Sequence, residues 1–204
     1  MIGMRMNRAL ASAAGRVAGA ITALALFSAP AYAQSMPVPI EIQYPLLMRV
    51  FSADRNLTAR SGSDMVIGVI YQKGVRESSQ AAAALQEWAR RNPSSPIAGS
   101  TVRLVPTAVD EMAGLDLRLL RDSVDLCYIA PLRAASLDSL LAATRRAGVA
   151  TCTGVPEYVE RGVSVGIGVK ADRPQILVNM SAAKAEGIEL GSQVLKLARV
   201  FGKD

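Results

Sequence analysis

Apolar residues recur along this chain with two different periods, and each period predicts a different element. A spacing of three to four residues is typical of a helix with one buried face, whereas short continuous or alternating apolar runs are typical of strands. A polar connection is expected at residues 54–64. Helices are predicted at residues 40–51, 78–91, 112–120 and 134–147, and strands at residues 65–71, 101–106, 124–130, 149–152, 163–169 and 176–180.

Pro45 falls inside the first of these helices. Proline has no backbone N–H to donate and is best tolerated in the first turn of a helix. The sequence therefore predicts that this helix either begins at Pro45 or is kinked there.

The C-terminal stretch has the clearest boundaries. After the strand at 176–180, Ser181 is predicted to cap a short alanine-rich helix that ends at Gly187, because glycine readily adopts the left-handed conformation found at helix ends. Ser192 is predicted to cap a second helix. Its apolar stripe is expected to close the core and consists of Leu190, Val194, Leu197, Ala198 and Phe201.

Strands that alternate with helices of about 10–15 residues predict an α/β fold with a mostly parallel sheet and helices on both faces. Residues 170–174 are expected to form a hairpin-like turn between the last two strands, which makes the sheet mixed. No repeat and no second domain is visible. The sequence therefore predicts a single α/β domain over residues 40–204.

The first 33 residues are expected to be a secretory signal peptide. Three arginines (Arg5, Arg8 and Arg16) accompany the apolar run at 17–27, and Ala31-Tyr32-Ala33 supplies the small residues that a signal peptidase requires. The alternative is a retained membrane anchor, but the apolar run is short for a bilayer span. We therefore expect cleavage after Ala33 and a periplasmic product with no direct membrane insertion.

Cleavage would also lower the formal charge of the chain. It leaves a short linker at residues 34–39 and reduces the formal charge from +6 to +3, because the predicted signal peptide carries three arginines and no acidic residue. The remaining chain has no block of Lys and Arg and few aromatic residues, so no nucleic-acid footprint is present.

The chain contains no histidine. This removes Ser-His-Asp and Cys-His nucleophile systems, histidine metal sites and the commonest general base. No phosphate-binding loop or dinucleotide fingerprint is present, and the carboxylates are scattered. We therefore expect no catalytic residues, no metal and no cofactor, and the protein is not predicted to be an enzyme.

Two cysteines, Cys127 and Cys152, lie in the exported part. An even number of cysteines in an oxidising compartment favours a disulfide, and the alternative, given their apolar surroundings, is two separate buried thiols. Each is the fourth residue of its predicted strand. If the two strands are neighbours and the cysteines are level with each other on one face, the sulfur atoms can approach bonding distance. If another strand lies between them, a direct bond is not expected.

The C-terminal stretch resembles the signature of the YfiR-like periplasmic family. In that family a strand ending in Ile-Asn-Leu leads into an Ala-rich turn and a Ser-x-Leu-Leu-Lys-Leu-Ala helix, which is similar to residues 176–198 here. Residues 43–51 are similar to the family's first helix. Residues 127–130 resemble its Cys-His-Ile-Leu strand, with Tyr128 in place of histidine.

This resemblance implies an α/β periplasmic protein that represses a membrane-bound diguanylate cyclase by binding the cyclase's periplasmic sensor domain. Such a role would control cyclic-di-GMP signalling and biofilm formation. Family members are often dimeric, so the resemblance implies a possible homodimer. Disulfides affect folding and repression in that family, which implies a redox role for Cys127 and Cys152.

The sequence is therefore compatible with two functions. The first is a regulatory binding protein, and its candidate partner-binding residues are Asn179, at a strand end, with Lys196 and Arg199, on the polar side of the last helix. Their structural alternatives are a turn or cap for Asn179 and a favourable charge at the helix C-terminus for the basic pair. The second function is a small-molecule binding module, since open α/β sheets bind ligands at the carboxyl ends of their strands.

Overall fold

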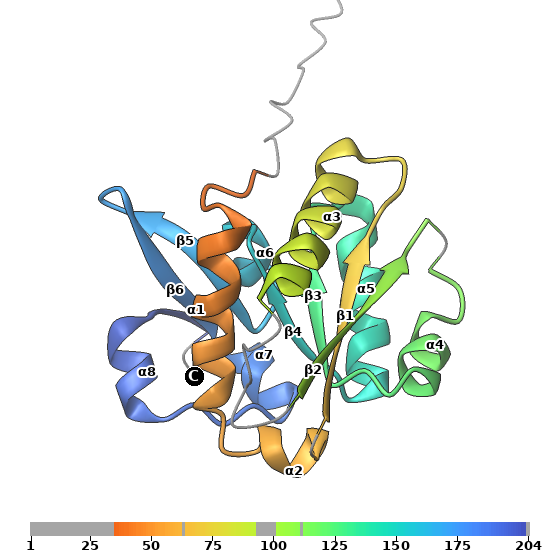
Figure 1. The fold of residues 1–204 in the computed structure, drawn as a ribbon. Coiled ribbons are helices and arrows are strands. Elements are labelled where there is room, and N and C mark those ends of the chain that lie inside the picture. Colours follow the sequence, from red (N-terminus) through yellow and green to blue (C-terminus); the bar gives the residue numbers. More distant parts are fainter. Residues whose placement is uncertain (1–34, 63, 93–100, 111, 203–204) are drawn as a thin grey trace, which may run out of the picture. The chain divides into compact units, whose positions relative to one another are not determined.

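Seven strands form one mixed sheet in the part of the chain that this computed structural model describes, namely residues 35–62, 64–92, 101–110 and 112–202 (Figure 1). The predicted signal peptide lies outside this part. In chain order the strands are β1 (Asp64–Tyr71), β2 (Thr101–Ala108), β3 (Leu126–Ile129), β4 (Ala150–Thr153), β5 (Val165–Lys170), β6 (Arg173–Asn179) and β7 (Arg199–Phe201).

The order of strands across the sheet is β2-β1-β3-β4-β5-β6-β7. The strands from β2 to β5 run parallel, β6 runs antiparallel to β5, and β7 runs parallel to β6. The reversal occurs at a tight turn in which Ala171 and Asp172 both have positive φ, as a two-residue hairpin requires. The predicted α/β fold with a mostly parallel, mixed sheet is confirmed.

Helices cover both faces of the sheet (Figure 1). Buried side chains of α1 and α3 pack on one face, and those of α4, α5 and α6 pack on the other. The bounds are α1 (Ile40–Ser52), α2 (Leu57–Ser61), α3 (Arg76–Arg91), α4 (Leu115–Arg121), α5 (Ala134–Ala147), α6 (Pro156–Glu160), α7 (Met180–Ala185) and α8 (Ser192–Leu197).

The central strands are apolar on both sides because both faces are covered. Along β1, Met65, Ile67 and Val69 face α1 and α3, while Val66 and Ile70 face the opposite core. This alternation explains why the run reads as continuously hydrophobic in sequence.

The first helix begins at Ile40 and contains Pro45, so of the two alternatives the start at the proline is wrong. Gln43 secures this earlier start. Its fully buried side chain donates to the Val38 carbonyl, and its Oε1 accepts the Tyr128 hydroxyl at 3.0 Å. A Cβ on Gly154 would collide with the Gln43 amide, so glycine is required at that close approach.

Two short helices have no counterpart in the predicted pattern. The polar connection at residues 54–64 contains α2, in which Leu57 is buried, and α6 follows β4 with Pro156 in its first turn. Each is only five residues long, which is too short to display a helical period.

The expected disulfide is absent, and both Cys127 and Cys152 are free and buried. Their strands are neighbours, as the prediction required, but the register is offset by one residue. Cys127 pairs with Thr151, and Tyr128 pairs with Cys152. Because successive side chains of a strand point to opposite faces, Cys127 lies in the core under α5 and Cys152 in the core under α1.

The C-terminal stretch departs most from its prediction. The cap of α7 is Asn179, whose Oδ1 accepts the Ala182 N–H at 3.0 Å, whereas the Ser181 hydroxyl donates to the Gly202 carbonyl. The next helix, α8, ends at Leu197 and has no side-chain cap from Ser192. Residues 199–201 instead form β7, because they extend the sheet by pairing with β6.

Candidate functional site

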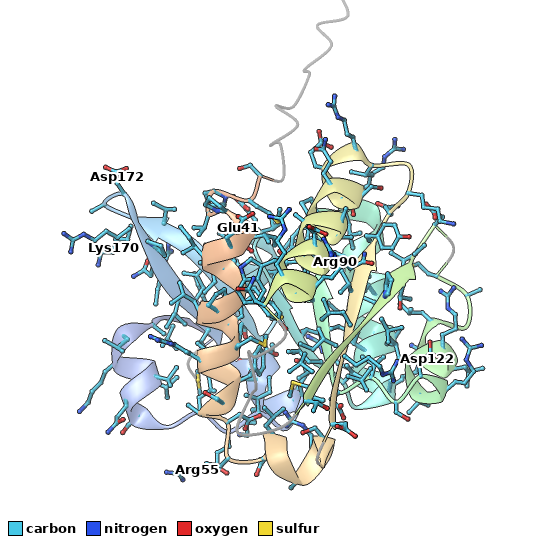
Figure 2. The ribbon with its side chains drawn as sticks, viewed as in Figure 1. Glu41, Arg55, Arg90, Asp122, Lys170 and Asp172 are labelled. Atoms are coloured by element: carbon cyan, nitrogen blue, oxygen red, sulfur yellow. The ribbon has the colours of Figure 1, made fainter. Side chains whose placement is uncertain are left out.

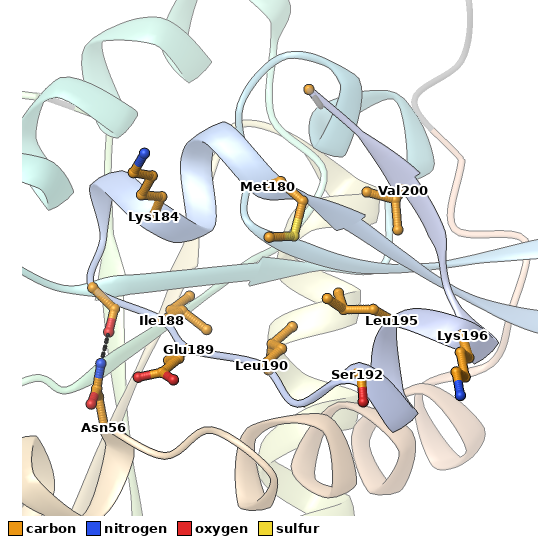
Figure 3. A pocket seen from close by; sticks show the side chains of 12 residues that line it. Asn56, Met180, Lys184, Ile188, Glu189, Leu190, Ser192, Leu195, Lys196 and Val200 are labelled. Carbon is orange, nitrogen blue, oxygen red and sulfur yellow. Dashed lines mark hydrogen bonds between the residues drawn. The ribbon is translucent and has the colours of Figure 1, made fainter. Parts of the chain in front are cut away.

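A cavity of about 860 Å³ lies at the β7 end of the sheet. Its walls come from α7, the following loop, α8 and β7, together with Asn56 from the turn before α2 (Figure 3). Five apolar side chains contribute to its lining, and Lys184, Lys196 and Glu189 supply the charged groups. The apolar members of this C-terminal cavity are Met180, Ile188, Leu190, Leu195 and Val200.

The antiparallel course of β6 determines where this cavity opens. The strand carries the chain back, so Asn179 and α7 lie beside the amino ends of the parallel strands. The carboxyl-end edge, where open α/β sheets usually bind ligands, has smaller cavities of about 380 and 280 Å³. Both are lined in part by the segment from Ser35 to Ile40, which lies against that edge.

A buried carboxylate holds one wall of the C-terminal cavity. Asp54 Oδ1 accepts the N–H groups of Asn56 at 3.1 Å and Glu189 at 2.9 Å, and its Oδ2 lies 2.7 Å from Arg60 Nη2. The Asp54 side chain is fully buried. Since these bonds connect the α1–α2 turn to a loop more than a hundred residues later, they fix the position of the wall.

The same loop is held at a second point. The Gly187 carbonyl accepts from Arg60 Nη1 at 2.7 Å and from Asn56 Nδ2 at 3.0 Å, the latter drawn in Figure 3. Gly187 has φ of 69°, the left-handed conformation expected at the end of the alanine-rich helix. Arg55, labelled in Figure 2, adds an exposed ion pair with Glu189 at 3.0 Å. The wall is therefore preorganised.

Glu186 connects α7 to the centre of the sheet. Its carboxylate accepts from the Thr151 N–H and from the hydroxyls of Thr151 and Ser164. Burial raises the pKa of Glu186, and the hydrogen bonds from Ser164 and Thr151 oppose that rise. The group is surrounded by donors on β4 and beside β5, so its role is to anchor the C-terminal segment.

The structure separates the three predicted partner-binding residues. Lys196 is exposed in the last turn of α8 and lines the C-terminal cavity. Asn179 is buried, and its amide donates to the Val159 carbonyl while it caps α7, so it is not the exposed group that was expected.

Arg199 is exposed, but it lies in β7 and not on the last helix. Its guanidinium stacks over the Phe201 ring at 4.6 Å and lies 3.7 Å from Glu160. Val200 lines the C-terminal cavity, and alternation along the strand places Arg199 on the opposite face. Only Lys196 of the three predicted residues therefore belongs to the cavity.

The two thiols are shielded from chemistry in the folded chain. Burial raises the pKa of both Cys127 and Cys152, so neither is a thiolate at neutral pH. The thiolate is the reactive form of cysteine. A redox role for these residues therefore requires the fold to open.

The lining of the cavity is mainly apolar, with two lysines and one glutamate as its charged members. Its exposed lysines and mostly apolar walls suit an apolar side chain or molecule that carries negative charge. Within the described residues no cluster of three or more metal-ligating side chains is present. Also within them, no helix has the length and hydrophobicity needed to cross a membrane.

Sequence reasoning missed Asp54, Arg60 and most of the cavity lining. Asp54 and Arg60 lie in a stretch that reads as a polar connection, and their partners are distant in sequence. The lining residues Leu190 and Leu195 do stand in an apolar C-terminal pattern. That pattern identifies apolar positions without showing whether a cavity or a core receives them.

One protein-family model, described as YfiR/HmsC-like, matches residues 59–199. The match covers more than half of the chain and confirms the resemblance seen in the sequence. It extends from α2 to β7 and includes most of the C-terminal cavity. A search of the curated proteins finds no match.

Solved structures share the fold. A conserved domain protein from Vibrio cholerae O1 biovar El Tor has a TM-score of 0.56 and 17% identity over 80% of this chain and 60% of that one. An ABC domain in complex with L-Trp from Streptococcus pneumoniae has a TM-score of 0.54 and 15% identity, with coverages of 80% and 60%.

A third structure is the ligand-free, open form of CD0873, a substrate binding protein with adhesive properties from Clostridium difficile. Its TM-score is 0.50 and its identity 18%, with coverages of 73% and 58%. At these identities the likeness shows the fold alone. This chain spans about three-fifths of the length of each of these three structures.

Proposed function

Because the chain belongs to the YfiR/HmsC-like family, we propose that it represses a membrane diguanylate cyclase by binding the cyclase's periplasmic sensor domain. Proteins of this family are periplasmic regulators, and they act in general through a membrane diguanylate cyclase. The match over residues 59–199 is the observation that carries the proposal. The expected consequence is control of cyclic-di-GMP and of biofilm formation.

The C-terminal cavity is the proposed contact surface for the sensor domain. Its apolar walls would receive an apolar side chain of the cyclase, while Lys196 would face acidic groups beside it. Leu197, the residue after Lys196, is 74% exposed at the end of α8 and would add an apolar side chain to the contact. Such a combination of an apolar centre with a charged rim is typical of protein–protein interfaces.

Export by a cleavable signal peptide at residues 1–33, followed by a linker at 34–39, is part of this proposal. Mass spectrometry of the protein recovered from the periplasm tests it, because cleavage after Ala33 would place Gln34 at the new N-terminus. The same sample in size-exclusion chromatography with light scattering measures whether the chain forms the homodimer that the family implies.

The principal test combines crosslinking in the host with measurement of cyclic-di-GMP. Deletion of the gene should raise cyclic-di-GMP, and crosslinked chain should co-purify with a membrane cyclase. Leu195→Glu, which introduces charge into the cavity, should fail to restore repression. The matched control Val169→Glu, on the exposed β5–β6 hairpin, should restore it. No cyclase and no change in cyclic-di-GMP would refute the repressor function.

A small-molecule binding module is the second candidate. The C-terminal cavity, at about 860 Å³, has a volume within the roughly 300–1,000 Å³ of ligand pockets. Two structural neighbours are an ABC domain in complex with L-Trp and a substrate binding protein. A thermal-shift screen of small anionic and amphipathic molecules tests this function, and a ligand whose effect disappears in Leu195→Glu would support it.

A further inference from the structure

Two leucines of α4 face solvent near the β2 end of the sheet. Leu117 is 70% exposed and Leu120 is 56% exposed, and they lie three residues apart, so they share one side of the helix. Leu115 and Leu119 of the same helix are buried in the core. Because the core-facing positions are already filled, the outward leucines do not serve the packing of this helix.

Arginines lie on α4 and on the elements beside it, where they contact the two aspartates of this segment. Arg103 of β2 donates to the Asp122 carbonyl at 3.4 Å, and Arg121 pairs with the Asp122 carboxylate at 3.0 Å (Asp122 is labelled in Figure 2). On the other side, Arg146 of α5 pairs with Asp116 at 2.8 Å. Arg121, Arg103 and Arg118 together lower the pKa of Asp122.

The charge of this surface is therefore positive. Arg121 and Arg146 are paired with the two aspartates (Asp122 and Asp116), and Arg103 donates to a carbonyl, which leaves a net charge of 3 − 2 = +1 beside two exposed leucines. Arginine binds phosphate through paired N–H groups, and leucine side chains enter the boundary between headgroups and acyl chains. The combination matches an anionic phospholipid surface in both charge and hydrophobicity.

We propose that this α4 patch (Arg103, Leu117, Leu120, Arg121 and Arg146) rests on the anionic phospholipid surface of the membrane. The proposal rests on the proposed function, because a repressor of a membrane enzyme works beside that membrane. Arg103 of the patch lies on β2, and Val200 of β7 lines the C-terminal cavity. These two strands are at opposite ends of the strand order (Figure 1). A membrane contact through α4 therefore leaves the cavity accessible to the cyclase.

Sedimentation with lipid vesicles tests the proposal on protein purified from the host periplasm. The chain should sediment with vesicles that contain phosphatidylglycerol and not with vesicles of phosphatidylcholine alone, and added salt should weaken the binding. Leu117→Ser/Leu120→Ser should reduce the partition coefficient at least about ten-fold. Arg103→Gln should reduce it about five-fold, the equivalent of one basic residue near an anionic surface.

Matched controls separate this surface from general stickiness. Val169→Ser/Leu197→Ser removes two apolar side chains that are exposed elsewhere and should bind vesicles as the wild type does. All variants should keep the wild-type thermal midpoint, since the changed side chains are exposed. Equal sedimentation of Leu117→Ser/Leu120→Ser and wild type, or no sedimentation with phosphatidylglycerol, overturns the proposal.

Crosslinking in detergent-solubilised membranes distinguishes this proposal from the proposed function. There Leu117→Ser/Leu120→Ser should still recover the cyclase, because the contact through the cavity is intact. Cyclase recovery without vesicle binding refutes only the membrane surface, and vesicle binding without any cyclase refutes only the repressor function. Capture of an acidic soluble protein by the α4 patch, with no vesicle binding, would show that the patch has a protein partner instead.

Discussion

Helices α5 and α8 have similar sequence patterns but lie in opposite environments. Both stretches carry apolar residues three to four positions apart. In α5 this pattern produces 14 helical residues with Leu137, Leu140 and Leu141 buried against the sheet. In α8 it produces six helical residues, none of them buried, with Leu197 exposed.

The difference lies in what each helix has beside it. The face under α5 is formed by β1 and β3, which send Ile70, Cys127 and Ile129 toward it. By contrast, α8 lies next to β6 and the three-residue strand β7 at the end of the sheet, where the C-terminal cavity remains open. An apolar period therefore shows which residues can be buried, and the position in the sheet decides whether they are.

Leu140→Ala should give the largest effect, because it removes a fully buried side chain from the α5 core. We expect it to lower the free energy of unfolding by about 2–5 kcal/mol. Urea unfolding followed by circular dichroism measures this. A loss comparable to that of Leu197→Ala would contradict the contrast between the two helices.

Asp54→Ala should weaken the wall of the C-terminal cavity at a cost of about 2 kcal/mol, because it removes three hydrogen bonds and leaves the mostly buried Arg60 without its carboxylate. Hydrogen exchange should show faster opening of the Glu189 amide than of β1 amides. Asp138→Ala, which removes a mostly exposed partner of Arg161, is the matched control and should leave that amide protected.

Glu186→Gln should lower stability at neutral pH by about 1 kcal/mol, because an amide replaces one accepting oxygen with a donor. The pH dependence is more specific. Burial holds the pKa of Glu186 above its ordinary 4.5, so the folded state binds the proton more tightly and the stability contribution of this group falls as pH rises from 4.5 through the raised pKa.

The difference in unfolding free energy between wild type and Glu186→Gln isolates this titration from all other groups. This difference should be constant well below pH 4.5. Above pH 4.5 the wild type should lose stability relative to Glu186→Gln. A difference that is the same at every pH would show that Glu186 titrates alike in the folded and unfolded chain.

Leu197→Ser should give the smallest effect, a change in unfolding free energy within about 0.5 kcal/mol, because the side chain is exposed. The same urea titration used for Leu140→Ala measures it. If this variant costs as much as a core substitution, α8 packs against the domain in solution and the cavity is more closed than described.

The sequence was sufficient to predict the central strands of the sheet, but not the C-terminal end of the sheet at β7. The buried strands and α5 were predictable because their patterns are long and their neighbours satisfy them, as Met65 to Ile70 illustrate. The hydrogen bonds of Asp54 were not predictable, because its partner Glu189 is 135 residues away in the sequence. Of the three predicted partner-binding residues, Lys196 lines the C-terminal cavity and its partner-binding role stays a prediction. Asn179 is a helix cap, and Arg199 belongs to a strand that in the sequence resembles the continuation of a helix.

The offset between Cys127 and Cys152 also bears on the order of events after export. A bond between the two sulfur atoms would require β4 to slip by one residue, which moves all of its side chains to the other face. If a Cys127–Cys152 bond forms before β3 and β4 pair, the two strands therefore cannot reach the native register. If the strands pair first, both thiols become buried. For a chain that is exported as proposed, we therefore expect the yield of folded protein to depend on folding being faster than oxidation of the two thiols.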